Sequence, residues 1–172
     1  MFPRGFTHPD LDFTLEDTQL QKSTLAQSTF MAIHFTKTVY EPPESEDGCR
    51  LIIMRRYPRG IAKSRAHGWV PQLAPTLPLV HWYHGNKRAI EARWQSRDPV
   101  RFEREIAKFW KTYSRRYLSE MRGQRSLIEL LASLQRDFGV TFTLLCACPD
   151  YRICHRSLLA PLINDALLGR QR

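Results

Sequence analysis

Residues 140–168 read VTFTLLCACPDYRICHRSLLAPLINDALL, and this stretch decides the fold. Residues 140–145 are mostly β-branched or aromatic and follow Gly139, which predicts a buried strand. From Ser157 the chain is rich in leucine, which predicts a helix that stops before Gly169. A strand, a polar loop and a helix in this order place the loop at the carboxyl end of the strand. Open α/β sheets bind their ligands at that edge.

The chain has 172 residues, which is enough for one domain of ordinary size. We predict an α/β fold, with a small, mostly parallel sheet flanked by helices, in a single compact domain over residues 30–172. Residues 1–29 hold four acidic residues and two prolines without helix or strand periodicity. They therefore predict a mobile acidic arm.

Cysteine usage and the first residues predict the compartment. Three of the four cysteines lie within the nine positions 146–154, unlike the spaced framework of a small secreted protein. We find no leader with a basic and then an apolar part, and no apolar run of membrane-spanning length. We expect a reduced, cytoplasmic protein that does not enter the membrane.

The charge of +9 is unevenly distributed along the chain. Residues 1–48 hold 3 Lys/Arg and 8 Asp/Glu, whereas residues 49–172 hold 23 and 9, so the two parts carry −5 and +14. A part this basic attracts polyanions, and nucleic acid is the commonest polyanion. A basic surface that serves only solubility is the alternative interpretation.

A second buried strand is predicted over residues 50–54, and it ends in RRYPRG at residues 55–60, which we call the arginine turn. We call residues 146–156 the cysteine loop. If the two strands are adjacent and parallel, cationic side chains of the turn and the loop converge on one pocket. Arginine matches phosphate and carboxylate with two parallel hydrogen bonds, although it also tethers loops. The predicted ligand-binding residues are Arg55, Arg59, Arg152 and Arg156, with His155 beside them.

Residues 61–80 predict a connector, and Thr76 could cap a short helix over residues 77–83. His81 and His84 follow one helical turn apart, so they share a face. Two histidines are too few ligands for a metal, and we interpret them as surface or packing residues.

Asp98 and Pro99 predict the start of a long helix, with a capping acid followed by proline. Aromatic residues recur along it at helical spacing and predict a buried stripe. Another face is basic and could follow a phosphate backbone, although a solvated face is the alternative. This predicted nucleic-acid surface consists of Arg101, Arg104, Lys108, Lys111 and Arg115.

The cysteine loop allows three interpretations. Cys146, Cys148, Cys154 and His155 could bind zinc, but their spacing is unlike the paired knuckles of structural zinc modules. Cys154, beside His155, or Cys146 could instead be a catalytic nucleophile, because Cys154 precedes a helix and has a histidine and an arginine next to it. We favour a third interpretation, in which the cysteines pack in the core while the arginines and His155 bind an anion. We therefore predict no metal.

Several segments together resemble the YeaO-like family of uncharacterised proteins, domain of unknown function 488. The resemblance covers about residues 31–168 in the right order. Its segments are TVYEPP at 38–43, RRYPRG at 55–60, LAPT at 73–76, Trp110 with Tyr113, YLSEM at 117–121, LLCA at 144–147 and CHRSLL at 154–159.

The resemblance implies a compact α/β domain of bacterial cytoplasmic type and no established activity. It also implies that two segments are hallmarks of the family, here Arg55, Pro58, Arg59, Gly60, Cys146, Cys154, His155 and Arg156. The chain departs from the family at Met54 and Arg56, at Pro161, in an added basic stretch over residues 86–97, and at Cys148, where an acidic residue is common. The loss of acidic residues makes the predicted pocket more cationic.

We therefore expect an anion-binding α/β domain that acts on a phosphate-bearing ligand, with nucleic acid or a nucleotide as its class. The first alternative is a thiol-dependent enzyme that uses Cys154 or Cys146. The second is a basic interaction module that docks an acidic protein partner. The sequence predicts no oligomeric state.

Overall fold

The structure is a computed structural model that describes residues 35–170. The chain divides into two units, Met1–Ala32 and Ile33–Arg172, and every described residue belongs to the second. The predicted acidic arm, residues 1–29, therefore lies outside the described residues. The described part is an α/β domain with a parallel sheet, as predicted.

Four parallel strands form the sheet in the order β1, β4, β2, β3. The central pair is β4 (Phe142–Cys146) and β2 (Cys49–Ile52), with β1 (Phe35–Thr38) beside β4 and the two-residue β3 (Gly68–Trp69) beside β2. All five residues of β4 are buried, as expected of an interior strand. Because β4 and β2 are adjacent and parallel, the cysteine loop and the arginine turn leave the same edge of the sheet.

β2 also contains Arg50, a buried charge that the apolar pattern did not predict. Its guanidinium pairs with the buried carboxylate of Asp47 and donates to backbone carbonyls of Glu41, Pro42 and Arg65. A buried charge is tolerated when it is paired and hydrogen-bonded in this way. Arg50 thereby ties the segments that enter and leave β2 to the sheet.

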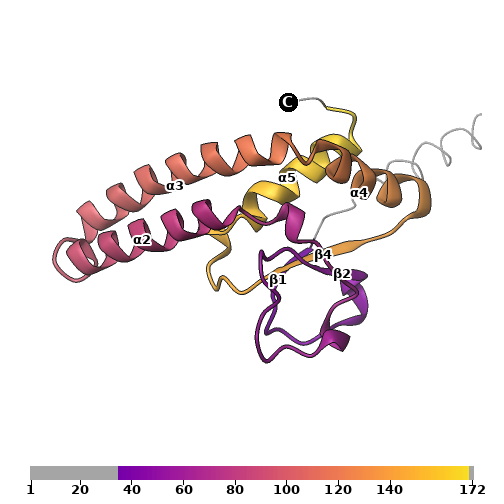
Figure 1. The fold of residues 1–172 in the computed structure, drawn as a ribbon, viewed down its shortest axis with the longest axis horizontal. Coiled ribbons are helices and arrows are strands. Elements are labelled where there is room, and N and C mark those ends of the chain that lie inside the picture. The colour runs from indigo at the N-terminus through magenta and orange to yellow at the C-terminus, as the bar shows by residue number, and fades with distance from the viewer. Residues whose placement is uncertain (1–34, 171–172) are drawn as a thin grey trace, which may run out of the picture. The chain divides into compact units, whose positions relative to one another are not determined.

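Two of the helices, α2 (Leu77–Trp94) and α3 (Pro99–Arg122), run side by side as a helical hairpin (Figure 1). α3 begins as predicted, because the carboxylate of Asp98 accepts a hydrogen bond from the Arg101 amide at 2.9 Å. The predicted aromatic stripe is buried at Phe109, Tyr113 and Tyr117, which stack along it, and is partly exposed at Phe102. This stripe is the face that α3 turns toward the core.

The remaining helices, α4 (Arg125–Phe138) and α5 (Arg156–Leu167), pack against each other, and α5 also contacts β4. Gly139 ends α4 in the left-handed conformation, with φ of 66°. The chain then enters β4, the cysteine loop and α5 in the predicted order. The start of α5 is therefore held against the carboxyl end of β4.

Two predictions of secondary structure were incomplete. β3 was missed, since two residues carry no periodicity. α2 continues to Trp94 instead of ending near residue 83, so most of the added stretch 86–97 is helical. Within residues 35–170, we find no helix with the length and apolar character needed to cross a membrane.

Candidate functional site

A cavity of about 470 Å³ lies where β2 and β4 end. Its walls come from the arginine turn, the cysteine loop, one face of α2, and Tyr113 of α3. The lining includes three cysteines, three histidines and the basic side chains of Arg55, Arg56 and Lys87. The cavity therefore joins the two loops that the sequence singled out.

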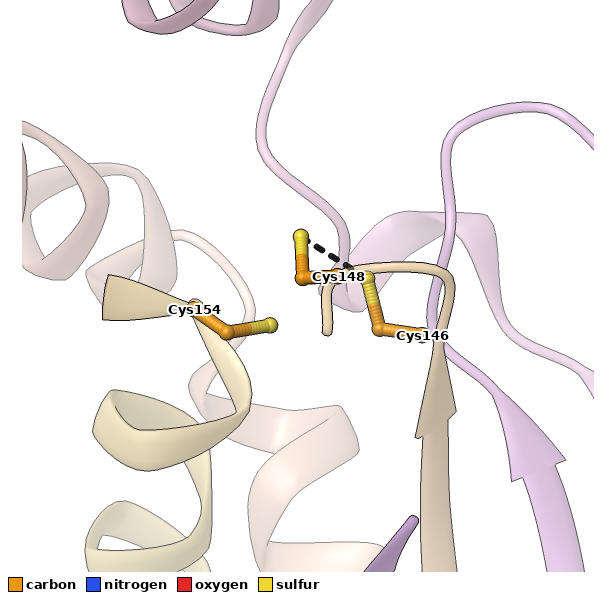
Figure 2. A group of neighbouring side chains, drawn as sticks. All are labelled: Cys146, Cys148 and Cys154. Carbon is orange, nitrogen blue, oxygen red and sulfur yellow. Dashed lines mark hydrogen bonds between the residues drawn. The ribbon is translucent and has the colours of Figure 1, made fainter. Parts of the chain in front are cut away.

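Cys146, Cys148 and Cys154 bring three sulfur atoms together at this cavity (Figure 2). The three Sγ atoms all lie within 4.8 Å of one another, and those of Cys146 and Cys148 are 3.6 Å apart. Figure 2 shows the side chains converging from the end of β4, from the loop after it and from the residues just before α5. All three cysteines are free thiols. We call them the thiol cluster.

Cys154 is the member of the thiol cluster with the most polar neighbours. Arg156 Nε donates a hydrogen bond to Cys154 Sγ at 3.3 Å, and His155 Nδ1 lies 3.8 Å from the same sulfur. His155 Nε2 is 2.7 Å from the carbonyl oxygen of Ile53, which can only accept, so Nε2 carries a proton. In the neutral ring, Nδ1 is then the acceptor and faces the thiol.

The three thiols differ in ionisation. Hydrogen bonds from Cys146 and Cys148, with a further contribution from His155, hold the pKa of the Cys154 thiol well below its usual range, despite its burial. The pKa of Cys146 is raised by its hydrogen bonds with Cys148 and Cys154 and by burial. The hydrogen bond with Cys146 lowers the pKa of Cys148, but the hydrogen bond with Cys154 and burial outweigh it and raise the value to about 11. The cluster thus favours one thiolate, at Cys154, with two neutral thiols beside it.

The buried charge of Arg156 agrees with a thiolate at Cys154. Arg156 is 2% exposed, and within residues 35–170 no carboxylate lies within 4.0 Å of its guanidinium. Its Nη2 donates to the backbone carbonyl of Cys148 at 2.7 Å. An unpaired buried charge is costly, so an anionic sulfur at Cys154 is the counterion that this arrangement accommodates.

Two tyrosines fix the loop and the histidine. Tyr83 of α2 donates its hydroxyl to the Ile153 carbonyl at 2.8 Å, which ties the cysteine loop to α2. The ring of Tyr117 lies 5.6 Å from that of His155, and its hydroxyl donates to the Leu73 carbonyl at 2.7 Å. Burial raises the pKa of both phenols, so both remain hydrogen-bond donors at neutral pH.

The arginines predicted to bind a ligand separate into different roles. Arg55 lines the cavity but also donates to the carbonyls of Pro75 and Ala74, at 3.0 and 2.6 Å. Arg156 supports the thiol cluster instead of lining the cavity. Arg59 and Arg152 are exposed and are not among the lining residues; Arg152 pairs with Asp150 at 3.0 Å. Of the residues predicted to converge on one pocket, Arg55 and His155 therefore line the cavity.

Several residues that line the cavity were not predicted as site residues from the sequence. His81, His84 and Lys87 contribute from one face of α2, and Arg56 contributes from the arginine turn. Their spacing of three residues along α2 was a usable signal for a common face. The common face of His81 and His84 was recognised but interpreted as surface or packing, and Lys87 was not added to it because the helix was predicted to stop near residue 83.

The predicted nucleic-acid surface lies on α3 and all of its side chains are exposed. Arg104 and Lys108 share Glu105, at 3.8 and 3.1 Å. The Arg101 guanidinium lies 3.6 Å from the ring centre of Trp94. Lys111 and Arg115 have no carboxylate within 4.0 Å in the described part of the chain. Positive charge on this face is therefore only partly neutralised.

The thiol cluster is also the place where this chain could ligate a metal. Cysteine sulfur is a soft ligand, and three thiolates leave one position open in a tetrahedral site. His155 Nδ1 points toward Cys154, and its other nitrogen donates to a backbone carbonyl, as histidine ligands do. The residues present thus fit a thiophilic ion such as zinc, although the spacing of the cysteines in the sequence is unlike that of structural zinc modules.

Fold and site together define a class: an α/β domain with a thiol-lined cavity at the carboxyl edge of a parallel sheet. The chain belongs to the DUF488 family, since the family model described as "DUF488-N3a: Active DUF488-N3 subclade" matches residues 34–167. This confirms the resemblance noted from the sequence.

The chain is also similar to two uncharacterised bacterial proteins. The "Uncharacterized protein Rv3073c" of Mycobacterium tuberculosis is 28% identical over 128 residues, which cover 73% of this chain and 89% of that protein. The "Uncharacterized protein YeaO" of Escherichia coli is 37% identical over 51 residues, covering 28% of this chain and 44% of that protein. No solved structure matches the chain.

Proposed function

We propose that the protein is a cysteine-dependent enzyme that acts on a phosphate-bearing ligand, with nucleotides or nucleic acid as the class. The observation that carries this proposal is the position of Cys154 Sγ, at a cavity and between Arg156 Nε and His155 Nδ1. A nucleophilic thiol needs a stabilised thiolate and a neighbouring group that can move a proton. The family description "Active" supports an enzyme as well.

Cys154 suits the role of nucleophile better than Cys146. Arg156 stabilises the Cys154 thiolate directly, whereas the pKa of Cys146 is raised. His155 Nδ1 can accept the thiol proton, while its Nε2 holds the ring in place through the Ile53 carbonyl. Cys146 and Cys148 then act as hydrogen-bond donors to the anionic sulfur.

The charge of the cavity supports an anionic ligand. Arg55, Arg56 and Lys87 line it, and Asp150 is the one carboxylate among the described lining residues. Asp150 is engaged by Arg152, at 3.0 Å. The apolar and aromatic parts of the wall suit the non-ionic part of a nucleotide.

The basic face of α3 supports a polymer as the ligand. It belongs to the same helical hairpin whose other helix, α2, lines the cavity. Its exposed cations would bind phosphates without reading sequence. An acidic protein could bind the same face instead. Measuring how the affinity for DNA and for an acidic protein depends on salt concentration distinguishes the two partners.

A reduced compartment, such as the cytoplasm, is the expected setting because the thiols must stay reduced.

Alkylation of the reduced protein with iodoacetamide, followed by peptide mass mapping, tests the nucleophile. At about pH 6, well below the ordinary thiol pKa of about 8.5, we expect Cys154 to be modified while Cys49 is not. Cys49 is a suitable internal control because it starts β2, does not line the cavity and has a pKa raised by burial. Four thiols that all react only at alkaline pH would refute the proposal.

Ligand class is tested by isothermal titration with nucleoside monophosphates, inorganic phosphate and a short single-stranded DNA. Arg56→Gln and Lys87→Gln should each weaken binding about tenfold, because each removes a positive charge from the cavity wall. Arg88→Gln is the matched control, since Arg88 is exposed on α2 and does not line the cavity. Equal affinity in all three variants would contradict an anion site here.

A further inference from the structure

We propose that the protein also carries out dithiol–disulfide exchange, with Cys154 as the attacking cysteine and Cys148 as the resolving cysteine. The substrates are low-molecular-weight disulfides that are small enough to enter the cavity. This inference rests on the proposed reactivity of Cys154. It assigns a role to Cys148, which the proposed nucleophilic chemistry uses only as a hydrogen-bond donor.

The distance between the sulfurs carries the inference. Cys148 Sγ and Cys154 Sγ lie within 4.8 Å of each other, whereas a disulfide bond measures about 2.0 Å. The gap can be closed by a change of side-chain torsion with a small shift of the loop. Both cysteines line the cavity; Cys154 is 1% exposed, so the cavity is the side from which a disulfide reaches its sulfur.

Cys148 is better suited than Cys146 to resolve the adduct. Cys146 is the last residue of β4 and pairs with Thr38 of β1. Its displacement would disturb the sheet. Cys148 is partly exposed and lies after the strand, in the cysteine loop. The sulfurs of Cys146 and Cys148 are 3.6 Å apart, but a bridge between residues only two apart in the chain is strained and therefore disfavoured.

The first step is attack by the Cys154 thiolate on one sulfur of the substrate RSSR. A bond forms between Cys154 Sγ and that sulfur, the S–S bond of RSSR breaks, and RS⁻ leaves. Cys154 now carries a mixed disulfide, and the charge that Arg156 compensated has left with RS⁻. Exchange proceeds through such a mixed disulfide in thiol chemistry generally.

In the second step Cys148 gives its proton to the released RS⁻ and attacks Cys154 Sγ. The Cys148–Cys154 bond forms and a second RS⁻ leaves. In total, one thiolate and one thiol of the protein are oxidised to a disulfide, and RSSR is reduced to RSH and RS⁻. No other oxidant is needed, and atoms, electrons and charge balance.

The Cys148–Cys154 disulfide would reversibly inactivate the proposed enzyme, because Cys154 is then no longer a thiolate. In an environment rich in disulfides, Cys154 is thereby protected from other reactions. A thiol reductant restores the thiolate. The same exchange therefore supplies both an activity and a means of switching the proposed one off.

The experiment uses the full-length reduced protein and oxidised glutathione as the probe. After acid quenching and alkylation, peptides are mapped by mass spectrometry without reduction, and released glutathione is measured. We expect the wild type to lose two of its four thiols, to release two glutathione molecules per chain, and to contain a Cys148–Cys154 disulfide. This measurement needs no variant, so it does not depend on a substitution being tolerated.

Three variants assign the roles. Cys148→Ser should retain one glutathione on Cys154, because the resolving thiol is absent. Cys146→Ser should still close the Cys148–Cys154 disulfide, and Cys49→Ser should behave as the wild type. Thermal melting checks that each variant is folded.

Two results would overturn the inference alone: glutathione retained on Cys154 in the wild type, or a bridge that joins Cys154 to Cys146. A Cys154 that reacts neither with glutathione disulfide nor with iodoacetamide would instead refute the proposed nucleophile itself. A Cys154 that is alkylated readily but never forms a disulfide refutes only the exchange. The two proposals can therefore fail separately.

Discussion

The cysteine loop and the outer face of α3 both carry arginines, but they place the positive charge in opposite environments. Arg156 is buried and donates to a thiol and a carbonyl, whereas Arg115 and its neighbours on α3 are exposed. Away from water, a cation strongly changes the ionisation of the group beside it. In water and salt, the same cation acts mainly on distant polyanions. The environment of an arginine therefore decides whether it changes the ionisation of a neighbouring group or attracts a charged partner.

The largest effect is expected from Arg156→Met, which removes the buried charge and keeps much of the volume. It deletes the hydrogen bonds to Cys154 Sγ and the Cys148 carbonyl and leaves the anionic sulfur without a counterion. We expect the free energy of unfolding to fall by about 3 kcal/mol. Alkylation of Cys154 at about pH 6 should slow more than tenfold. Urea unfolding and peptide mapping measure the two effects.

Arg152→Met is the matched control for this comparison. Arg152 belongs to the same loop, but its side chain is 87% exposed, and Asp150 is its one ion-pair partner among residues 35–170. Its removal should change neither the unfolding free energy nor the alkylation of Cys154. If Arg152→Met and Arg156→Met changed the unfolding free energy and the alkylation rate equally, burial would not explain the effect of Arg156.

The next effect concerns pH and Cys148, the neutral partner in the thiol cluster. Its pKa is about 11 in the folded chain, against about 8.5 for an ordinary thiol. Between these values the unfolded chain loses a proton that the folded chain keeps, so stability falls as pH rises. Cys148→Ala should reduce this loss by up to about 1.4 kcal/mol per pH unit. Urea unfolding under reducing conditions at several alkaline pH values measures it, and parallel curves for both proteins would contradict it.

A smaller effect is expected for His155→Gln. The glutamine amide can still donate to the Ile53 carbonyl, but it has no ring nitrogen that faces Cys154. We expect a stability loss of about 1 kcal/mol and a shift of Cys154 alkylation toward higher pH. His84→Gln, on the wall of the cavity that α2 forms, is the control and should leave the pH profile of alkylation unchanged. An unshifted profile in His155→Gln would remove His155 from the proposed proton transfer.

Much of the fold followed from local pattern. The apolar run before the cysteine loop, the Asp98 cap and the aromatic spacing of α3 each depend on neighbours within a few turns, so the sequence predicts them. β3 did not follow, because its two residues are held in the sheet by pairing with β2. The sequence did not show that β2 and β4 are adjacent; the pocket was predicted on that condition, and the strand order of the sheet meets it.

The site was less predictable than the fold, because it depends on where side chains point. Nothing in the spacing of Cys148 and Cys154 indicates that the loop folds back and brings their sulfurs together. Likewise, the motif around Arg55 does not reveal that carbonyls of Pro75 and Ala74 occupy its guanidinium. Residue types thus indicated which residues belong to the site. Their contacts depend on long-range packing, which the sequence does not show.

The smallest effect on the domain itself is expected on α3. Lys111→Gln with Arg115→Gln should leave unfolding and Cys154 alkylation unchanged, since both side chains are exposed. If single-stranded DNA binds this face, the slope of log affinity against log salt should become shallower by about 1.4, at about 0.7 for each phosphate that the variant no longer neutralises. Fluorescence anisotropy over a range of salt concentrations measures the slope. Arg104→Gln with Lys108→Gln is the matched control and should change it less, because Glu105 already neutralises part of that charge. An unchanged slope in both double variants would exclude the face from DNA binding. A change in Cys154 alkylation would mean that exposed charges on α3 influence the ionisation of the thiol cluster.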